Sequence, residues 1–244
     1  MIQHIKKLFS LALFLCVLQN ITAQNHQNIW FRTTLNIPVT EKFKTEFELQ
    51  HRRQNDVESN SPFDKNLMYS FRTWMYYKKN KNLTFGLSPF AYFSNYKIIQ
   101  KSGDAAIQPS HEYRFTASVE LQNALTTKWF LVNRTAIEYR AFEKNITHTA
   151  RLRNKLALKY EINAKYSTLF GDEVLINASG TDTQHIFDHN RLFANFSYQP
   201  KTNIKIDVGY IHSSRLLKNS TDLLTENNFF LNLTYTLAHA KPHL

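Results

Sequence analysis

Apolar and polar residues alternate with a period of two along most of this chain, from Ile29 to Leu237. In the segment His111–Ala124, for example, Tyr113 and Phe115 alternate with charged or hydroxyl-bearing residues. Successive side chains of a β-strand point to opposite faces of the sheet. The alternation therefore predicts a series of strands, each with one apolar face and one polar face.

Short and long connections alternate between these segments. The predicted strands are Ile29–Ile37, Lys42–Arg53, Lys65–Lys78, Leu83–Lys97, His111–Ala124, Trp129–Phe142, Thr149–Ile162, Tyr166–Asn177, Asp188–Gln199, Asn203–Ser213 and Asn228–Leu237. The short connections are 38–41, 79–82, 125–128, 163–165 and 200–202, and the longer polar ones are 54–64, 98–110, 143–148, 178–187 and 214–227. Outer-membrane barrels have tight periplasmic turns and longer outer loops, so the first set is predicted to face the periplasm.

The predicted fold is all-β: a transmembrane antiparallel up-and-down β-barrel of ten to twelve strands, formed by residues 24–244. A soluble β-sandwich also contains many alternating strands. Three features favour the barrel: strands that approach 14 residues, well beyond the usual five or six, an apolar face rich in aromatic residues, and an opposite face that is charged along its length. Bacterial single-chain barrels have an even number of strands. Eleven segments therefore imply either that Ile29–Ile37 is not an ordinary barrel strand or that another strand is missed or split.

Residues 1–23 have the organisation of a secretory signal peptide. Lys6 and Lys7 precede an apolar run over residues 8–18, and Ala23 supplies a small residue at a cleavage site. This run is too short to cross a bilayer as a helix. We therefore expect an exported, outer-membrane protein whose mature chain begins at Gln24. Cys16 is the only cysteine, so cleavage would leave no thiol chemistry.

Arginine, lysine and glutamate alternate on the faces that the pattern assigns to the barrel lumen. The predicted lumenal charged network is Glu48, Arg52, Arg72, Glu112, Arg114, Glu120, Arg134, Glu138, Arg140, Arg151, Arg153, Lys155, Glu161, Glu173 and Arg191. In a narrow lumen these groups would pair across the interior. Two interpretations stay open: a packed ionic core that fills the barrel, and a small polar channel that the excess of cations biases towards anions.

Several short motifs resemble the family called domain of unknown function 2490. They are Trp30-Phe31-Arg32, Glu46-Phe47-Glu48-Leu49-Gln50-His51-Arg52, His111-Glu112-Tyr113-Arg114, Glu138-Tyr139-Arg140, Arg151-Leu152-Arg153 and Gly171-Asp172-Glu173. The resemblance covers most of the mature chain. That family is found mainly in Bacteroidetes, and its members look like outer-membrane barrels of no established activity. The resemblance implies that the arginine and glutamate residues of these motifs form the lumenal network.

One pair of residues suggests catalysis as an alternative function. His212 and Ser214 are two positions apart and so share one face of a strand. Outer-membrane phospholipase A and lipid A deacylase barrels look similar there, with a His-x-Ser pair that serves as base and nucleophile. The match departs from their pattern, since Arg215 and Leu216 stand where an Asn-Gly would follow. The pair also shares parity with Val208, which places it on the lipid-facing side.

Other classes of chemistry have no support in the sequence, and we expect no cofactor. The histidines His26, His185, His189, His239 and His243 lack a regular ligand spacing, so no metal site is predicted. No glycine-rich phosphate loop is present. The net charge of +11 is spread over alternate positions, which does not indicate nucleic-acid binding. The expected partners are outer-membrane lipid, lipopolysaccharide and the barrel-assembly machinery, which would read the alternating C-terminal strand, while the small-molecule ligand is left open.

Overall fold

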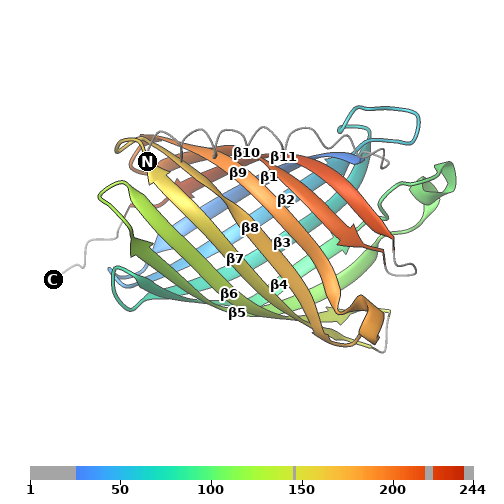
Figure 1. Cartoon of the computed structure of the whole chain (residues 1–244), viewed down its shortest axis with the longest axis horizontal. Helices are drawn as coiled ribbons and strands as arrows, with labels where there is room; N and C mark the ends of the chain where they lie inside the picture. The colour runs from blue at the N-terminus through green and yellow to red at the C-terminus, as the bar shows by residue number, and fades with distance from the viewer. Residues whose placement is uncertain (1–25, 145–146, 218–221, 239–244) are drawn as a thin grey trace, which may run out of the picture.

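Eleven strands pair in chain order and close into a barrel in this computed structural model, which describes residues 26–144, 147–217 and 222–238 (Figure 1). The strands are β1 (His26–Pro38), β2 (Phe43–Gln54), β3 (Lys65–Lys78), β4 (Leu83–Asn95), β5 (Ser110–Ala124), β6 (Trp129–Phe142), β7 (Thr149–Glu161), β8 (Tyr166–Ser179), β9 (Phe187–Lys201), β10 (Ile204–Leu216) and β11 (Leu223–Thr236). Two short 3-10 helices, η1 (Ser102–Ala106) and η2 (Thr183–His185), lie in long connections. The predicted all-β barrel is confirmed.

Five short turns gather at one end of the barrel, hereafter the turn end, and the longer connections at the other, the loop end (Figure 1). Four of the turns share the same side-chain to backbone hydrogen-bonding pattern. The side-chain oxygen of Thr40, Asn80, Thr126 or Asn163 accepts hydrogen bonds from the backbone N–H groups two and three residues later. Threonine and asparagine hold tight turns in this way. The turn residues therefore fix where each hairpin reverses.

The barrel closes with a parallel pair, β1 against β11, whereas all other neighbours are antiparallel. Both explanations offered for an odd number of segments are therefore wrong for the described residues: residues 29–37 lie within β1, an ordinary barrel strand. An odd count makes the first and last strands run in the same direction, and their parallel pairing still satisfies both free edges. Asn28 adds buried side-chain hydrogen bonds to Glu226 at 2.9 Å and to Asn228 at 2.8 Å.

The structure also shifts several predicted strand boundaries, and the largest shift lies between β10 and β11. The predicted connection 214–227 is shorter, because β10 continues to Leu216 and β11 begins at Leu223. The signal segment, with Cys16 and the proposed cleavage before Gln24, lies outside the described residues, as do His239 and His243.

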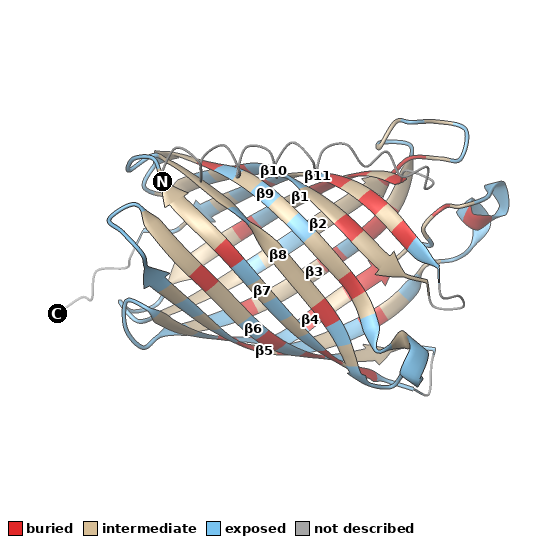
Figure 2. Cartoon of the chain, viewed as in Figure 1, coloured by how far each residue is buried: buried red, intermediate tan, exposed pale blue. Residues whose placement is uncertain are grey.

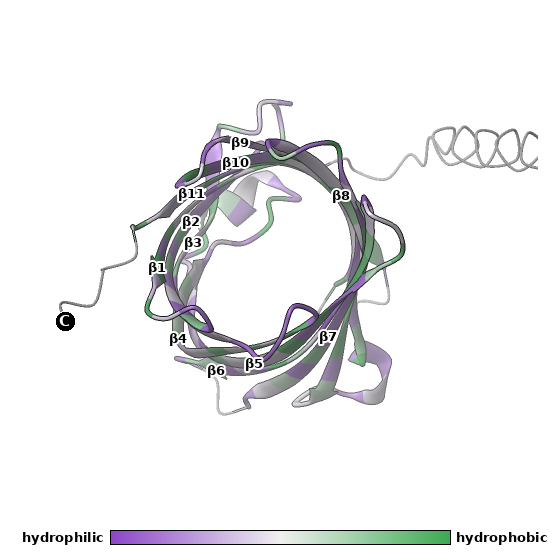
Figure 3. Cartoon of the chain, turned by 90° about the vertical axis from the view of Figure 1, so that its left-hand side faces the viewer, coloured by the Kyte–Doolittle hydropathy of each residue, from purple (hydrophilic) through white to green (hydrophobic). Residues whose placement is uncertain are grey.

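Burial in this barrel is inverted relative to a soluble protein. Among the described residues, buried polar and charged residues outnumber buried hydrophobic ones, while large hydrophobic side chains are exposed on every strand except β1. Buried positions gather towards the loop end, at the right of Figure 2. Seen along its axis from the turn end, the sheet forms a closed ring (Figure 3). No helix in the described ranges is long and apolar enough to cross a membrane.

Candidate functional site

The barrel interior contains a cavity of about 920 Å³. Every strand contributes a side chain to its wall. Thirteen lining residues are cationic: Arg32, Arg52, Arg72, Lys97, Arg114, Arg134, Arg140, Arg151, Arg153, Lys155, Arg191, Lys205 and Arg215. Five are acidic: Glu48, Glu173, Asp188, Asp207 and Glu226. The surface of the cavity is therefore rich in positive charge.

Glu138 on β6 is the centre of the ionic network. Its side chain is fully buried, and four guanidinium groups lie within ion-pair distance of its carboxylate. Arg72 is 3.7 Å away, Arg114 is 3.6 Å away and Arg153 is 3.4 Å away, and Arg151 also contacts it. Three of these arginines also pair with a second carboxylate: Arg114 with Glu112, Arg151 with Asp188 and Arg153 with Glu173.

Further ion pairs extend the network around the wall. Glu112 on β5 is fully buried and accepts hydrogen bonds from Arg114 and, at 2.8 Å, from Arg140. Glu173 on β8 pairs with Arg153 at 2.7 Å and with Arg191 at 3.2 Å. Because each acid bridges arginines of neighbouring strands, the network joins β5 to β9 into one charged surface.

Three lining cations have no carboxylate within 4 Å in the described part of the chain: Arg52, Arg134 and Lys155. Aromatic rings lie beside them instead. Arg52 stacks on Trp30, with its guanidinium carbon 3.5 Å from the ring centroid, and Arg134 lies 4.8 Å from the centroid of Trp74. Cation–π contact holds a cation in place without neutralising it. These three groups line the cavity without a carboxylate partner.

The predicted lumenal residues occupy three kinds of position. Eleven line the cavity: Glu48, Arg52, Arg72, Arg114, Arg134, Arg140, Arg151, Arg153, Lys155, Glu173 and Arg191. Glu112 and Glu138 are buried in the wall, beneath their arginine partners. Glu120 and Glu161 lie outside the cavity lining, and Glu161 pairs with Lys159 at 2.7 Å.

Sequence reasoning missed seven charged residues of the lining: Arg32, Lys97, Asp188, Lys205, Asp207, Arg215 and Glu226. Arg215 and Glu226 form an ion pair of 3.0 Å in a stretch that was assigned to a loop. Arg32 shares the inward parity of Trp30, and Asp188 opens a predicted strand. The signal that could have found Glu226 is its two-residue spacing from Leu224 and Asn228, which also face inward.

The connection between β4 and β5 lies over the loop end of the cavity, where Ile98, Gln100, Ile107 and Gln108 line it. Gln54 at the end of β2 anchors this connection, since its side chain accepts the N–H of Ile99 at 3.1 Å and donates to the Lys97 carbonyl at 2.9 Å. Asp104 of η1 adds a second anchor, an ion pair with Lys97 of 2.8 Å. The hydrogen bond from Lys97 lowers the pKa of Asp104 below its usual value.

His212 and Ser214 lie on the outside of the barrel, near the loop end of β10. The Nδ1 atom of His212 is 3.1 Å from Oδ1 of Asn227, which also accepts the Tyr210 hydroxyl at 2.6 Å. No hydrogen bond joins Ser214 to His212 in the described residues. The same trio recurs on β2 and β3: Asn66 Oδ1 lies 3.2 Å from His51 and accepts the Tyr69 hydroxyl at 3.0 Å.

The described histidines all lie at the loop end, either in a long connection or in the adjoining part of a strand. They are His26, His51, His111, His148, His185, His189 and His212. His51 stacks on Tyr69 with 4.2 Å between ring centroids, and Tyr92 donates to or accepts from Nδ1 of His111 at 2.8 Å. No group of three histidine, cysteine or acidic residues in the described ranges is arranged to hold a metal ion.

Comparison with known proteins agrees with this geometry. The chain is similar to a solved structure of the NanC porin, with a TM-score of 0.52 and 10% sequence identity over 87% of this chain and 99% of that one. At this identity the likeness concerns the fold. No match was found among curated protein sequences. A family profile described as "Protein of unknown function (DUF2490)" matches residues 27–238, so the chain belongs to the DUF2490 family.

Proposed function

We propose that the chain is a bacterial outer-membrane channel that passes small solutes and prefers anions. The observation that carries this proposal is the cavity, whose lining has thirteen cations against five acids. Fixed cations in a low-dielectric wall raise the local concentration of anions and exclude cations. Arg52, Arg134 and Lys155 support the preference most directly, because no carboxylate neutralises them.

The outer surface supports a location in a membrane. Leu49 is 60% exposed, Ile137 54% and Phe229 53%, all on the outward faces of strands. In water such a belt would be unfavourable, whereas lipid accommodates it. Strands of 12 to 15 residues are long enough to cross a bilayer at the tilt of a barrel. In this proposal the turn end faces the periplasm, lipopolysaccharide surrounds the loop end, the assembly machinery inserts the barrel, and the signal over residues 1–23 is removed.

Conductance in planar lipid bilayers tests the proposal. Protein purified from the outer membrane, with its first residue determined by sequencing, is expected to give current steps and a reversal potential in a KCl gradient that indicates chloride preference. The triple variant Arg52→Gln, Arg134→Gln and Lys155→Gln should lower the chloride-to-potassium permeability ratio at least about threefold, because it removes the unpaired charges. Folded, inserted protein without current above background would contradict the channel and leave a closed ionic core.

A lipid hydrolase that uses His212 and Ser214 is the second candidate function. The contact between His212 and Asn227 favours it, since a hydrogen bond at Nδ1 would orient the ring so that Nε2 could accept a proton from a serine. A similar histidine–asparagine–tyrosine contact occurs at His51, through Nε2 and with no serine two residues away, so such contacts are also found at the loop end without a nucleophile. The channel is therefore the better supported proposal.

Phospholipid hydrolysis by purified protein in mixed micelles distinguishes these candidates. If the pair is catalytic, Ser214→Ala abolishes the release of fatty acid, while His51→Ala, which removes a ring in the same type of contact, leaves it unchanged. Equal rates for the wild-type protein and Ser214→Ala would eliminate the hydrolase.

A further inference from the structure

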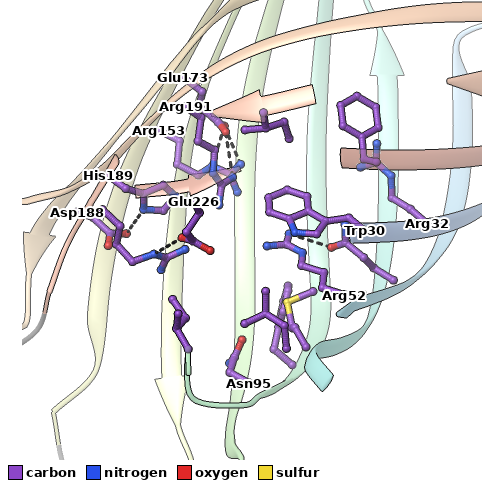
Figure 4. Close-up of a pocket in the computed structure, with 18 of the residues that line it drawn as sticks. Trp30, Arg32, Arg52, Asn95, Arg153, Glu173, Asp188, His189, Arg191 and Glu226 are labelled. Atoms are coloured by element: carbon purple, nitrogen blue, oxygen red, sulfur yellow. Dashed lines mark hydrogen bonds and ion pairs between the residues drawn. The ribbon is translucent and has the colours of Figure 1, made fainter. Parts of the chain in front are cut away.

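Trp30 and two arginines form a distinct cluster in the wall of the cavity. Trp30 on β1 is 5% exposed and pairs in register with Arg52 on β2. The guanidinium carbon of Arg52 lies 3.5 Å from the Trp30 ring centroid, and that of Arg191 on β9 lies 5.7 Å from the same centroid. Figure 4 shows all three side chains on the cavity wall. Two guanidinium groups thus share one aromatic ring.

This cluster contains hydrogen-bond donors that the protein does not satisfy. The Nε atoms of Arg52 and Arg191 and the Nε1 atom of Trp30 are buried and have no partner. The Nε atoms of Arg72, Arg114 and Arg151 also lack a partner, but each of these arginines lies within ion-pair distance of Glu138. Among the described residues Arg52 has no carboxylate within 4 Å. Buried donors without an acceptor are unfavourable and rare. Arg52, Arg191 and Trp30 all line the cavity, so a solute held there could supply the acceptor.

Two neighbouring side chains, Gln50 and Trp30, hold the guanidinium group of Arg52 in place. Its Nη2 donates to Gln50 at 3.0 Å, and its plane is stacked on Trp30. Glu226 is already engaged by Asn28 at 2.9 Å and by Arg215 at 3.0 Å. A guanidinium that is fixed and unpaired presents a preformed fork, the geometry that suits a planar carboxylate or a phosphate.

We propose that Arg52, Arg191 and Trp30 form a binding site for the carboxylate or phosphate group of a small solute. The inference deepens the proposed channel function, because such a site would select the anions that enter the lumen. The cavity of about 920 Å³ is far larger than an inorganic ion needs, so the oxyanion can carry an organic body. Glu173 and Glu226 border the cluster and disfavour a second negative charge on the same solute.

Equilibrium binding to the purified full chain in detergent micelles, measured by isothermal titration calorimetry, tests this site without requiring an open channel. The probes are butyrate, its neutral amide butyramide, and inorganic phosphate. We expect saturable binding of butyrate or phosphate and none of butyramide. Binding of butyrate alone identifies the solute group as carboxylate, and binding of phosphate alone identifies it as phosphate. Equal binding of butyramide and butyrate, or no binding of either anion, would overturn the site.

Single substitutions test whether the anion binds at the cluster of Arg52, Arg191 and Trp30. Arg52→Gln should weaken binding at least about tenfold, since it removes a charged donor. Lys159→Gln is the matched control, because it removes one positive charge that is already paired with Glu161 and lies outside the cavity lining; its affinity should stay within about twofold of wild type. An affinity for Arg52→Gln equal to wild type would contradict the proposal.

A second, more conservative variant keeps the test informative if Arg52→Gln fails to fold. Trp30→Phe keeps an aromatic ring under Arg52 but removes the Nε1 donor, so it should fold and bind the anion more weakly. Folding of each variant is checked by circular dichroism and by heat-dependent gel mobility. Anion-selective conductance without saturable binding would overturn the site and leave the channel, while saturable binding without conductance would overturn the channel and leave the site.

Discussion

The carboxylates of this barrel differ in burial and in the number of cations that they contact. Glu138 has an exposed fraction of zero and meets four guanidinium groups, whereas the side chain of Glu161 is 40% exposed and meets one lysine. Removing one partner from a buried ionic cluster leaves uncompensated charges in a low dielectric, while an exposed pair contributes little. The two residues therefore offer a matched comparison.

Glu138→Gln is expected to destabilise the barrel by about 3–5 kcal/mol, because Arg72, Arg114, Arg151 and Arg153 would lose their shared counter-charge. Glu161→Gln should cost less than about 1 kcal/mol. Urea unfolding of both variants in lipid vesicles measures the free energies. If Glu138→Gln were as stable as Glu161→Gln, the central role of Glu138 in the network would be refuted.

Eleven of the fifteen residues that sequence parity assigned to the lumen line the cavity, but parity could not pair them. Arg151 and Glu138 both have inward parity, and the sequence alone gives no reason to join them rather than other residues of the same faces. Their pairing follows from the register of β6 on β7, in which Glu138 is opposite Arg151. The approach of Arg72 from β3 depends on barrel closure, which no local pattern encodes.

At the scale of elements, the connection between β4 and β5 is held by a small number of polar contacts. Asp104 pairs with Lys97 and accepts the N–H groups of Gln100 at 3.0 Å and Lys101 at 3.2 Å. Its pKa is below the usual aspartate value, chiefly through the hydrogen bond from Lys97. A lowered pKa in the folded state stabilises the loop above the ordinary carboxyl pKa, and this stabilisation is lost as the pH falls through the lowered value.

Asp104→Ala is expected to speed amide hydrogen exchange in the peptide 97–108 at least about fivefold at neutral pH, relative to intrinsic rates, because the anchoring hydrogen bonds are lost. The wild-type loop should lose this protection only in acid, below the ordinary aspartate pKa. Asp56→Ala is the control, since Asp56 pairs with Lys65 in a different loop. Mass spectrometry measures the exchange, and unchanged protection in Asp104→Ala would show that Gln54 alone anchors the loop.

Most strand positions could be predicted from the two-residue period, and the failures have a physical cause. The start of β11 was missed because Thr225-Glu226-Asn227 reads as a polar loop. In the barrel Glu226 is buried beside Asn28 and Arg215, so a charged residue occupies an inward strand position. The alternation of apolar residues identifies only the outward face of a strand. A strand end with few apolar residues on that face is therefore not recognised from the sequence.

At the scale of the whole molecule, the two ends of the barrel differ in chemistry. The described histidines lie at the loop end, often beside tyrosine, while each of the five short turns carries lysine at its centre or edge. Tyrosine and histidine rings suit the boundary between an apolar and a polar layer. This asymmetry supports the proposed orientation, in which the loop end faces outward.

The parallel pairing of β1 with β11, hereafter the seam, limits the order in which the strands can assemble. Asn28 and Asn228 are separated by 200 positions, so the seam pairs the earliest and latest strands that the ribosome delivers. Until β11 arrives, β1 keeps one edge open, and an open edge is a template for association with other strands. The pairing of β1 with β11 can therefore form only after β11 has been synthesised, and under the proposed outer-membrane location β1 would need protection from other strands until then.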